Sequence, residues 1–458
     1  MRWASALITL FMATGLVMSS LPASAATDLQ GLIDAAAPGS VVVLPSGTYD
    51  GNVLIDKPLE LRGEGWPVID GHGQGNVIEV TVPDVTITGL RIINTGDSLD
   101  QENAGISSLA PQMTIVNNRL ENVLFGIFLR RGDNSLVADN VVVAMEQELG
   151  RRGDGIRLWE SSGSVVRNNL VDGGRDTVLW FSNDLVVTDN QFTNGRYGIH
   201  AMYSDRVLIE NNYLSGNSVG GFLMYSKDLV FNNNLVTNNH GPSGYGVGLK
   251  DIDGVEAIGN HFLSNRIGIY FDNSPSTPGV EHEISGNLFG YNDFGVAFLP
   301  SVRGNNLSAN AFVDNGEQVA VQGKGEFLGQ NAWTVGGAGN HWSDFAGYDA
   351  DNDGIGDVSY QLADLFSTLT DNNPELQFFD QTPASQAVDL AGKMFPVFRP
   401  RPKVTDSAPL IEMPSIPTPV VLPIEGSAAA TGAAASVMVA LAAGLWMIGR
   451  TPIRRARS

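Results

Sequence analysis

The sequence predicts an all-β fold, a right-handed parallel β-helix whose turns are about 22 residues long. The segment Gly198–Ser204 (GIHAMYS) returns 22 residues later as Gly220–Ser226 (GGFLMYS). Asparagines also recur along the chain, at spacings of 21 to 29 residues. This asparagine column contains Asn118, Asn140, Asn169, Asn190, Asn212, Asn234, Asn260, Asn287 and Asn310. A strand–helix–strand crossover needs about 30 residues, so turns of this length fit a coil of short strands better.

Short apolar runs separated by Asn, Gly and Ser indicate two or three strands in each turn. Asparagines stacked at the strand spacing of about 4.8 Å can form a ladder of side-chain amides inside the turns. A leucine-rich repeat is the alternative. It fits less well, because the turns carry no helical pattern and few leucines recur at fixed places.

The chain begins with a predicted export signal. Residues 1–25 combine an apolar run with the cleavage pattern Ala23-Ser24-Ala25, as secretory signals do. The β-helix is expected over residues 27–335. Residues 29–37 predict a short amphipathic helix that caps its first turn, because a solenoid needs an atypical terminal unit to protect its edge.

The C-terminal part is expected to anchor the protein. Residues 336–395 predict a cap with an acidic loop, and residues 396–426 a Pro-rich linker. Residues 427–449 carry no charge and are long enough for a transmembrane helix. Four arginines lie in the tail at 450–458, so the positive-inside rule places this tail in the cytoplasm and the soluble part on the outer side of the membrane.

Composition excludes some functions. The formal net charge of −22 disfavours binding to nucleic acid, which is itself a polyanion. The chain has no cysteine. Stability must therefore come from the repeat core rather than from disulfides, and no thiolate can serve as a nucleophile or metal ligand.

Alternation along the strand at 199–203 predicts which side chains face outward. Ile199 and Ala201 match apolar positions of other turns and are assigned to the interior, so His200 and Met202 face outward. Met224 is expected next to Met202 on the following turn. Two thioethers and an imidazole form a soft ligand set suited to Cu(I).

The same outer face is expected to present bulky groups to a partner. These partner-binding candidates are Trp159, Trp180, Phe222 and Lys250. Exposed apolar groups on an acidic protein commonly mark a contact surface, and methionine suits such a surface because it adapts its shape. A copper site and a protein-binding patch are both open interpretations of these residues.

An acidic loop follows the predicted β-helix. Asp349, Asp351, Asp353 and Asp357 alternate around Gly354, and the carbonyl of Ile355 can add a further oxygen ligand. The spacing resembles the first part of a calcium loop. The glutamate that ends an EF-hand loop is missing, and a loop without bound metal is the alternative.

Taken together, these motifs make the chain resemble the NosD family, periplasmic maturation proteins of nitrous oxide reductase with a β-helix of carbohydrate-binding/sugar-hydrolase (CASH) type. The resemblance covers roughly residues 27 to 410. The matching segments are Gly174–Asp176, Arg196–Ser204, Gly221–Ser226, Tyr245–Lys250 and Gly339–Asp357.

The resemblance implies a non-catalytic accessory protein for denitrification. Such a protein docks on an ABC transporter made of a permease and an ATPase. It assists assembly of the copper–sulfur centre of apo nitrous oxide reductase, with a copper chaperone as donor and Cu(I) bound transiently. Only His200, Met202 and Met224 receive the copper role. The predicted helix at 427–449 departs from the typical member and would hold the protein at the inner membrane beside the permease.

An enzyme is the alternative function, because the β-helix also hosts polysaccharide lyases, hydrolases and epimerases. Trp159 and Trp180 could stack on sugars, and acid-base chemistry could come from Arg157, Lys250, Asp251 and Asp272. Against this interpretation, we expect no pair of outward carboxylates flanking a basic residue on adjacent turns, although glycosidases need two carboxylates. A structural surface protein with a dimer patch is a third possibility.

Overall fold

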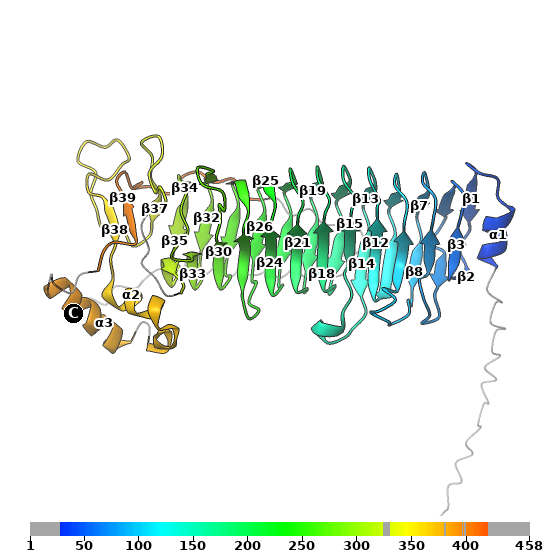
Figure 1. The fold of residues 1–458 in the computed structure, drawn as a ribbon, viewed down its shortest axis with the longest axis horizontal. Helices are drawn as coiled ribbons and strands as arrows, with labels where there is room; N and C mark the ends of the chain where they lie inside the picture. Colours follow the sequence, from blue (N-terminus) through cyan, green and yellow to red (C-terminus); the bar gives the residue numbers. More distant parts are fainter. Residues whose placement is uncertain (1–27, 324–329, 380–381, 396, 398–399, 420–458) are drawn as a thin grey trace, which may run out of the picture.

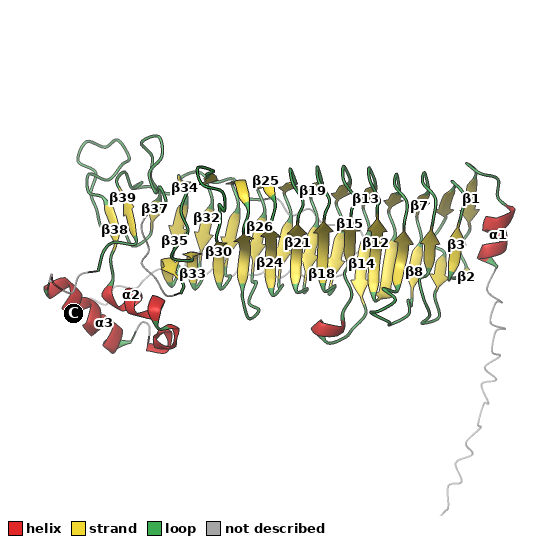
Figure 2. Ribbon diagram, viewed as in Figure 1, coloured by secondary structure: helices red, strands yellow, loops and turns green. Residues whose placement is uncertain are grey.

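The computed structural model describes residues 28–323, 330–379, 382–395, 397 and 400–419. Within them the chain coils into a parallel β-solenoid of about twelve turns (Figure 1). Each full turn contributes one strand to each of three sheets, so strand i pairs with strand i+3. The predicted parallel β-helix is confirmed. Figure 2 shows that the helices lie at the two ends of the solenoid, apart from one 3-10 turn, η1 (Leu149–Arg151), in a side loop.

Three strand sets build the solenoid. Sheet I contains β1 (Val41–Leu44), β4 (Glu60–Gly63), β7 (Thr86–Thr88), β10 (Thr114–Val116), β13 (Leu136–Ala138), β16 (Val165–Arg167), β19 (Val186–Thr188), β22 (Leu208–Glu210), β25 (Lys227–Asn232), β28 (Asp253–Ile258), β31 (His282–Ser285) and β34 (Asn305–Ser308). Sheet II contains β2 (Thr48–Asp50), β5 (Val68–Asp70), β8 (Arg91–Ile93), β11 (Arg119–Val123), β14 (Val141–Ala144), β17 (Leu170–Asp172), β20 (Gln191–Thr193), β23 (Tyr213–Ser215), β26 (Leu235–Thr237), β29 (His261–Leu263), β32 (Leu288–Gly290), β35 (Ala311–Val313) and β37 (His341–Trp342). Sheet III contains β3 (Val53–Ile55), β6 (Ile78–Val80), β9 (Ala104–Ser108), β12 (Phe125–Arg130), β15 (Ile156–Trp159), β18 (Asp176–Trp180), β21 (Tyr197–Met202), β24 (Val219–Met224), β27 (Tyr245–Lys250), β30 (Ile267–Asp272), β33 (Phe294–Phe298) and β36 (Glu317–Val321).

The predicted asparagine ladder runs between sheets I and II. The Asn212 carboxamide oxygen accepts the backbone N–H and the side-chain amide of Asn190, both at 3.0 Å, and Asn234 does the same for Asn212. The ladder side chains are buried. Each therefore satisfies polar backbone groups at a corner where no strand partner exists.

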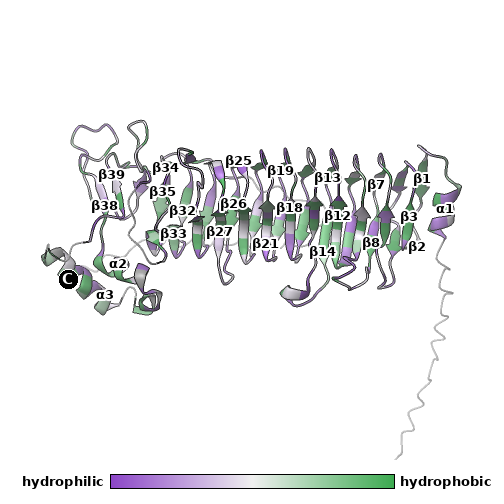
Figure 3. Ribbon diagram, viewed as in Figure 1, coloured by the Kyte–Doolittle hydropathy of each residue, from purple (hydrophilic) through white to green (hydrophobic). Residues whose placement is uncertain are grey.

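Apolar side chains fill the interior of the solenoid. Figure 3 shows the strands coloured mainly hydrophobic and the turns mainly hydrophilic. Phe231, Phe262, Phe289 and Phe312 stack on successive turns with ring centroids 4.9 to 6.3 Å apart. Trp342 continues this stack at 4.4 Å from Phe312. Burial of such rings is the main favourable contribution to the stability of the stack.

The first turn is covered by α1 (Leu29–Ala35), close to the helix that the sequence predicts. Leu29 and Ile33 are fully buried against the first strands. The Gln30 side chain donates to the Leu54 carbonyl and accepts the Leu54 N–H, at 3.1 and 2.8 Å. The helix thus supplies the hydrogen bonds that the edge strand β3 would otherwise lack.

The last turn is covered by a cap that the later part of the chain forms. Strands β38 (Tyr360–Leu362) and β39 (Val404–Asp406) pair antiparallel, and the Tyr360 ring stacks on Trp342 at 4.4 Å. Asp406 is fully buried and accepts the Asn340 N–H at 2.7 Å, so it takes the place of the next asparagine in the ladder. Helices α2 (Leu365–Asn372) and α3 (Pro383–Met394) and the 3-10 segment η2 (Pro374–Phe379) lie beside this end (Figure 1).

Two expectations about the C-terminal part can be placed against the structure. Strand β39 falls inside the segment 396–426 that the sequence suggests to be a linker, so part of that segment belongs to the cap. Within the described residues, no helix is both long and apolar enough to cross a membrane. The predicted signal at 1–25, the predicted membrane helix at 427–449 and the basic tail at 450–458 lie outside the described residues.

Candidate functional site

Sheet III carries an outward row of large side chains across five turns. The register pairs Trp159 with Trp180, Trp180 with Met202, Met202 with Met224, and Met224 with Lys250. All five side chains are half-buried. The two methionines are therefore direct neighbours on adjacent strands, about 4.8 Å apart at the backbone. Of the predicted partner-binding residues, Trp159, Trp180 and Lys250 share this row with the methionine pair.

His200 lies on the same outer face as Met202, two residues earlier in β21, but its ring is not open to solvent. Only 7% of the residue is exposed. Trp180 and Tyr197 contact the imidazole edge-on, with centroids 5.0 and 4.9 Å away, and Phe222 lies nearly parallel to it at 6.5 Å. The expectation of an exposed imidazole is therefore wrong, because bulky rings on the neighbouring positions cover it. Phe222, the remaining partner-binding candidate, belongs to this enclosure.

A buried carboxylate orients the imidazole. The Nδ1 atom of His200 lies 3.2 Å from a carboxylate oxygen of Asp176, which is 2% exposed. Arg196 binds the same carboxylate through Nε at 2.9 Å and through a second guanidinium nitrogen. Burial alone would raise the pKa of Asp176, but the hydrogen bonds from His200 and Arg196 outweigh it and lower the pKa. An ionised Asp176 accepts the Nδ1–H proton, and this tautomer leaves the Nε2 lone pair available to a metal.

Lys250 ends the outward row in an ion pair. Its ammonium group lies 2.6 Å from a carboxylate oxygen of Asp272 and 3.7 Å from Asp251. The hydrogen bond to Asp272 raises the pKa of Lys250, which is therefore charged at neutral pH. Farther along the row, the rings of Trp159 and Trp180 lie 5.3 Å apart. The Trp180 N–H is buried and has no hydrogen-bond partner among the described residues.

Two buried acidic residues form ion pairs on the outer face of sheet III. Asp154 and Asp176 lie on consecutive turns, and both bind basic groups on the outer face of sheet III. Asp154 contacts Arg157 at 2.9 Å and Arg175 at 3.1 Å. Arg157 is also held by Glu102, at 2.6 Å, from the loop before β9. Two carboxylates therefore lie beside basic residues on adjacent turns, but as buried ion pairs rather than as outward acids open to a substrate.

The signal for this cluster was present in the sequence but weak. Asp154 precedes β15 and Arg175 precedes β18, so neither falls within the strand alternation that identifies outward positions. Burial raises the pKa of Asp154, whereas the charges of Arg157 and Arg175 lower it. Asp154 and Asp176 are 0% and 2% exposed. Both carboxylates form ion pairs with arginine side chains, and neither reaches solvent.

The acidic loop gathers three of its predicted ligands. Single carboxylate oxygens of Asp349, Asp351 and Asp353 all lie within 4.8 Å of one another. Asp349 accepts the Gly354 N–H at 2.9 Å, and this hydrogen bond is the main cause of its lowered pKa. The charge of Asp353 raises the pKa of Asp351. Such repulsion between neighbouring carboxylates is what a bound cation relieves.

The other two predicted ligands of this loop have backbone partners. The Asp357 carboxylate accepts the Ala350 N–H at 2.7 Å. The Ile355 N–H donates to Asp353 at 2.8 Å, and Ile355 forms a bridge with Leu410 of the C-terminal segment. The loop is therefore fixed to the cap rather than to the methionine row.

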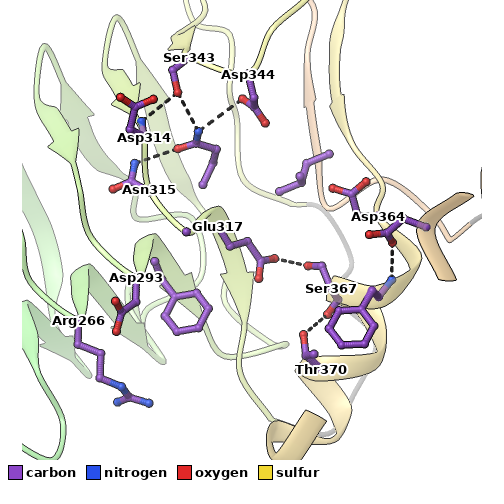
Figure 4. A pocket seen from close by; sticks show the side chains of 16 residues that line it. Arg266, Asp293, Asp314, Asn315, Glu317, Ser343, Asp344, Asp364, Ser367 and Thr370 are labelled. Carbon is purple, nitrogen blue, oxygen red and sulfur yellow. Dashed lines mark hydrogen bonds between the residues drawn. The ribbon is translucent and has the colours of Figure 1, made fainter. Parts of the chain in front are cut away.

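A cavity of about 590 Å³ lies between the end of sheet III and helix α2 (Figure 4). Its lining includes six acidic residues and one basic residue, Arg266; the acidic residues are Asp293, Asp314, Glu317, Asp344, Asp364 and Asp389. None of the residues predicted for copper, calcium or partner binding lines it.

Beside this cavity, a buried ion cluster joins the cap to the solenoid. Lys403 contacts Glu317 at 2.8 Å and Asp371 at 2.5 Å, and the Ser367 hydroxyl also binds Glu317. Burial raises the pKa of Glu317 although Lys403 lowers it. Sequence reasoning missed this cluster, because Glu317 and Lys403 are 86 residues apart and no repeat relates them.

Comparison with known proteins places this geometry in a family context. Residues 143–347 match the sequence model of a family described as periplasmic copper-binding protein (NosD). Residues 24–223 match a second model, described as rhamnogalacturonase A/epimerase, pectate lyase-like. A probable ABC transporter binding protein NosD of Pseudomonas aeruginosa is 38% identical over 387 residues, which cover 81% of this chain and 88% of the relative. The protein of the same name from Stutzerimonas stutzeri is 36% identical, with 81% and 87% covered.

The similarity to solved structures concerns the fold. The A-module of a mannuronan C-5 epimerase from Azotobacter vinelandii aligns with a TM-score of 0.54 at 17% identity. The alignment covers 66% of this chain and 94% of the module. Identity this low shows a shared β-solenoid and carries no conclusion about activity.

Proposed function

The chain belongs to the NosD family of periplasmic copper-binding proteins, and from this premise we propose that it is a non-catalytic accessory protein for nitrous oxide reductase. It docks on an ABC transporter in the periplasm and holds Cu(I) transiently while the copper–sulfur centre of the enzyme is assembled. A copper chaperone supplies the metal, and apo nitrous oxide reductase is the enzyme in which the centre is assembled.

One observation supports the copper role above all others. Met202 and Met224 are register partners on the outer face of sheet III, and His200 lies two residues from Met202 on that face. Asp176 accepts the Nδ1–H of His200, so Nε2 is the imidazole nitrogen that would bind the metal. Two thioethers and one neutral imidazole are soft and borderline ligands that favour Cu(I) over harder cations.

The same ligand set suits a transient site. Thioethers are neutral and carry no proton that must leave before the metal binds, whereas thiolates bind more tightly and are absent from the chain. The half-buried methionines leave one side of the site open to a partner. The ionised Asp176 behind His200 orients the imidazole without contacting the metal.

Docking on the transporter is the second part of the proposal. We assign Trp159, Trp180, Phe222 and Lys250 to the partner-binding face. Trp180 and Lys250 flank the methionine pair, Trp159 extends this row, and Phe222 is the register partner of His200. The relatives from Pseudomonas aeruginosa and Stutzerimonas stutzeri are named probable ABC transporter binding proteins. The predicted helix at 427–449 would hold the protein at the inner membrane next to the permease.

We also propose that the loop around Asp349, Asp351 and Asp353 binds Ca²⁺ with a structural role. Its carboxylates converge and repel one another. Oxygen ligands of this kind suit a hard cation.

A polysaccharide-processing activity is the second candidate, and the carboxylates Asp154 and Asp176 with their basic neighbours favour it. Both are buried and ion-paired, which opposes proton exchange with a substrate. Release of unsaturated or epimerised products from uronic-acid polymers by the purified protein would establish the enzyme and refute the non-catalytic assignment.

The accessory role is tested by gene deletion and complementation. We expect the deletion strain to export nitrous oxide reductase without its catalytic centre, visible as loss of the cluster absorption and of nitrous oxide reduction. The wild-type gene restores both, and a gene with His200→Ala, Met202→Ala and Met224→Ala does not. A deletion strain that reduces nitrous oxide at the normal rate would overturn the proposal.

A further inference from the structure

The end of the described chain runs back from the cap over the outer face of sheet II. Residues 409–419 are here called the strap. At its start, Leu410 forms a β-bridge with His341, and the His341 imidazole lies 3.3 Å from the Leu410 carbonyl. Near its end, the Pro417 carbonyl accepts a hydrogen bond from the His261 imidazole, since proline has no N–H to donate. Between these contacts the strap passes from β37 to β29, three strands back along the sheet.

The strap covers one row of outward side chains on sheet II. The register pairs Leu235 with His261 and His261 with Leu288. Leu235 and Leu288 are half-buried, whereas only 7% of His261 is exposed. The contact with Pro417 accounts for this difference. His261 therefore marks a place where the strap lies directly on the row.

The same row continues beyond the strap with uncharged side chains. Its next members are half-buried and lie in register on consecutive strands; they are Leu235, Tyr213, Gln191 and Leu170. The chain as a whole carries a formal net charge of −22. On such a protein, a row without charges is a suitable surface for an apolar segment, because no ionised group has to lose its water when the row is covered.

The chain that follows the strap has the composition to occupy this row. Residues 420–424 read Val-Val-Leu-Pro-Ile and carry no charge. Prolines favour an extended conformation, because they hold φ near −65° and donate no hydrogen bond. They recur through the strap and the following segment, at Pro414, Pro417, Pro419 and Pro423. An extended apolar segment can therefore bury its side chains across the row without pairing with the strands.

The number of residues fits the distance along the row. Consecutive strands lie about 4.8 Å apart, so Tyr213 is about 10 Å beyond His261. An extended proline-rich chain advances about 3.1 Å per residue and crosses this distance in about three residues. The strap itself uses seven residues, from Leu410 to Pro417, to pass three strands. At that rate two strands take about five residues. Tyr213 is therefore reached between Val420 and Leu422.

We propose that the row Leu235, Tyr213 and Leu170 is the docking site of the chain's own segment 420–424, which extends the strap along sheet II. The proposal follows from the continuity of the row with the contacts of the strap and from the place where the described chain ends. Docking places residue 427, the start of the predicted membrane helix, at the side of the solenoid rather than at its capped end. The bilayer then lies along sheet II, and the methionine pair on sheet III faces away from this contact. Only the orientation depends on the predicted helix; the docking does not.

Disulfide cross-linking tests the docking, because the chain has no cysteine of its own. Tyr213→Cys is combined in turn with Val420→Cys, Val421→Cys and Leu422→Cys in the full chain. The matched control replaces Tyr213→Cys by Leu208→Cys, a half-buried outward position of sheet I on the same turn. The positive control joins His261→Cys to Pro417→Cys. Disulfides formed with diamide are detected by gel mobility and mapped by mass spectrometry.

We expect at least one Tyr213 pair to cross-link within the chain at least about ten times faster than the corresponding Leu208 pair, because docking raises the effective concentration of the two thiols. If all three Tyr213 pairs cross-link no faster than the Leu208 pairs, the proposal is overturned. Disulfides that join two chains assign the row to a second copy of the protein, and this result also overturns the proposal.

Alkylation of Tyr213→Cys alone distinguishes the segment from the bilayer as the cover of the row. A second full chain adds Val420→Ser, Val421→Ser, Leu422→Ser and Ile424→Ser. A water-soluble maleimide should react with the cysteine at least about tenfold faster in this second chain, because the segment no longer covers it. Leu208→Cys should react at the same rate with and without the serines. A Tyr213→Cys rate that the serines leave unchanged, or that rises only when detergent removes the membrane, contradicts docking of the segment.

Discussion

Replacing Asp176 by Asn tests how the buried carboxylate supports the candidate copper site. Asp176 accepts charge-assisted hydrogen bonds from Arg196 and from the His200 Nδ1–H, and 2% of the residue is exposed. Each such bond contributes roughly 1.5–3 kcal/mol. The Arg196 side chain is 38% exposed, so water compensates part of the loss. We expect the free energy of unfolding to fall by about 2–4 kcal/mol.

The same substitution acts on copper through the imidazole. An asparagine side chain carries no charge and no longer fixes the Nδ1–H tautomer of His200. Loss of an outer-shell partner typically weakens metal binding about 10–100-fold, which corresponds to about 1.4–2.7 kcal/mol. Cu(I) affinity is measured by competition with a chelator, and stability by urea unfolding.

The pH dependence follows from the sign of the shift. The pKa of Asp176 is lowered in the folded protein, so its stabilisation is complete above the unfolded pKa of about 4. It is lost as the pH falls through the folded pKa, because the unfolded state then binds the additional proton. The stability difference between wild type and Asp176→Asn should therefore shrink below about pH 4.

The matched control is Asp184→Asn, which removes a carboxylate from an exposed pair with Arg206. We expect it to change neither Cu(I) affinity nor stability measurably. If Asp176→Asn also leaves Cu(I) affinity within twofold of wild type, the carboxylate does not orient a metal ligand and this reasoning is refuted.

Three further predictions concern other parts of the structure. Burial lowers the pKa of His282 to about 4. The unfolded state therefore binds more protons than the folded state between about pH 4 and 6.5. As the pH is lowered from 6.5 to 4, the free energy of unfolding measured in urea should decrease by roughly 3 kcal/mol in wild type but not in His282→Asn. Lys403→Met leaves Glu317 and Asp371 buried without their cation, so it should destabilise the cap by about 3–5 kcal/mol, whereas adding Glu317→Gln and Asp371→Asn should restore much of the loss. Equal stability of the single and triple variants would contradict this account. Ca²⁺ should raise the midpoint of thermal unfolding of wild type and not of Asp353→Asn, and identical shifts in both proteins would exclude the loop as the site.

The repeat makes much of the solenoid predictable from the sequence. In a parallel coil, residues one period apart become neighbours, so the column of asparagines specifies the amide ladder directly. The same rule places Met202 beside Met224. It also places Trp180 and Lys250 on either side of this methionine pair. Alternation along β21 correctly assigns Ile199 and Ala201 to the interior.

Burial on the outer face could not be predicted in the same way. Alternation gives the direction of the His200 side chain, whereas its 7% exposure depends on the sizes and rotamers of Trp180, Tyr197 and Phe222. Asp154 lies outside the alternating strand positions, so the alternation could not predict its ion pairs with Arg157 and Arg175. Packing between neighbouring side chains determines these features, and the repeat of the sequence does not specify that packing.

The cap is less predictable still, because its contacts are not periodic. Strand β39 pairs with β38 across more than forty intervening residues. Asp406 ends the asparagine ladder although it lies 66 residues after Asn340. A Pro-rich composition suggests a linker, and only the long-range hydrogen bonds and the buried Lys403 reveal a structural element.

Titration of the purified protein with Cu(I) against a competing chelator addresses the metal site itself. Wild type is predicted to bind about one Cu(I) per chain, and the variant His200→Ala/Met202→Ala/Met224→Ala none in the same range. A variant lacking the distant exposed methionines Met394 and Met413 should bind like wild type. Undiminished affinity in the triple alanine variant would show that this face of sheet III does not hold copper.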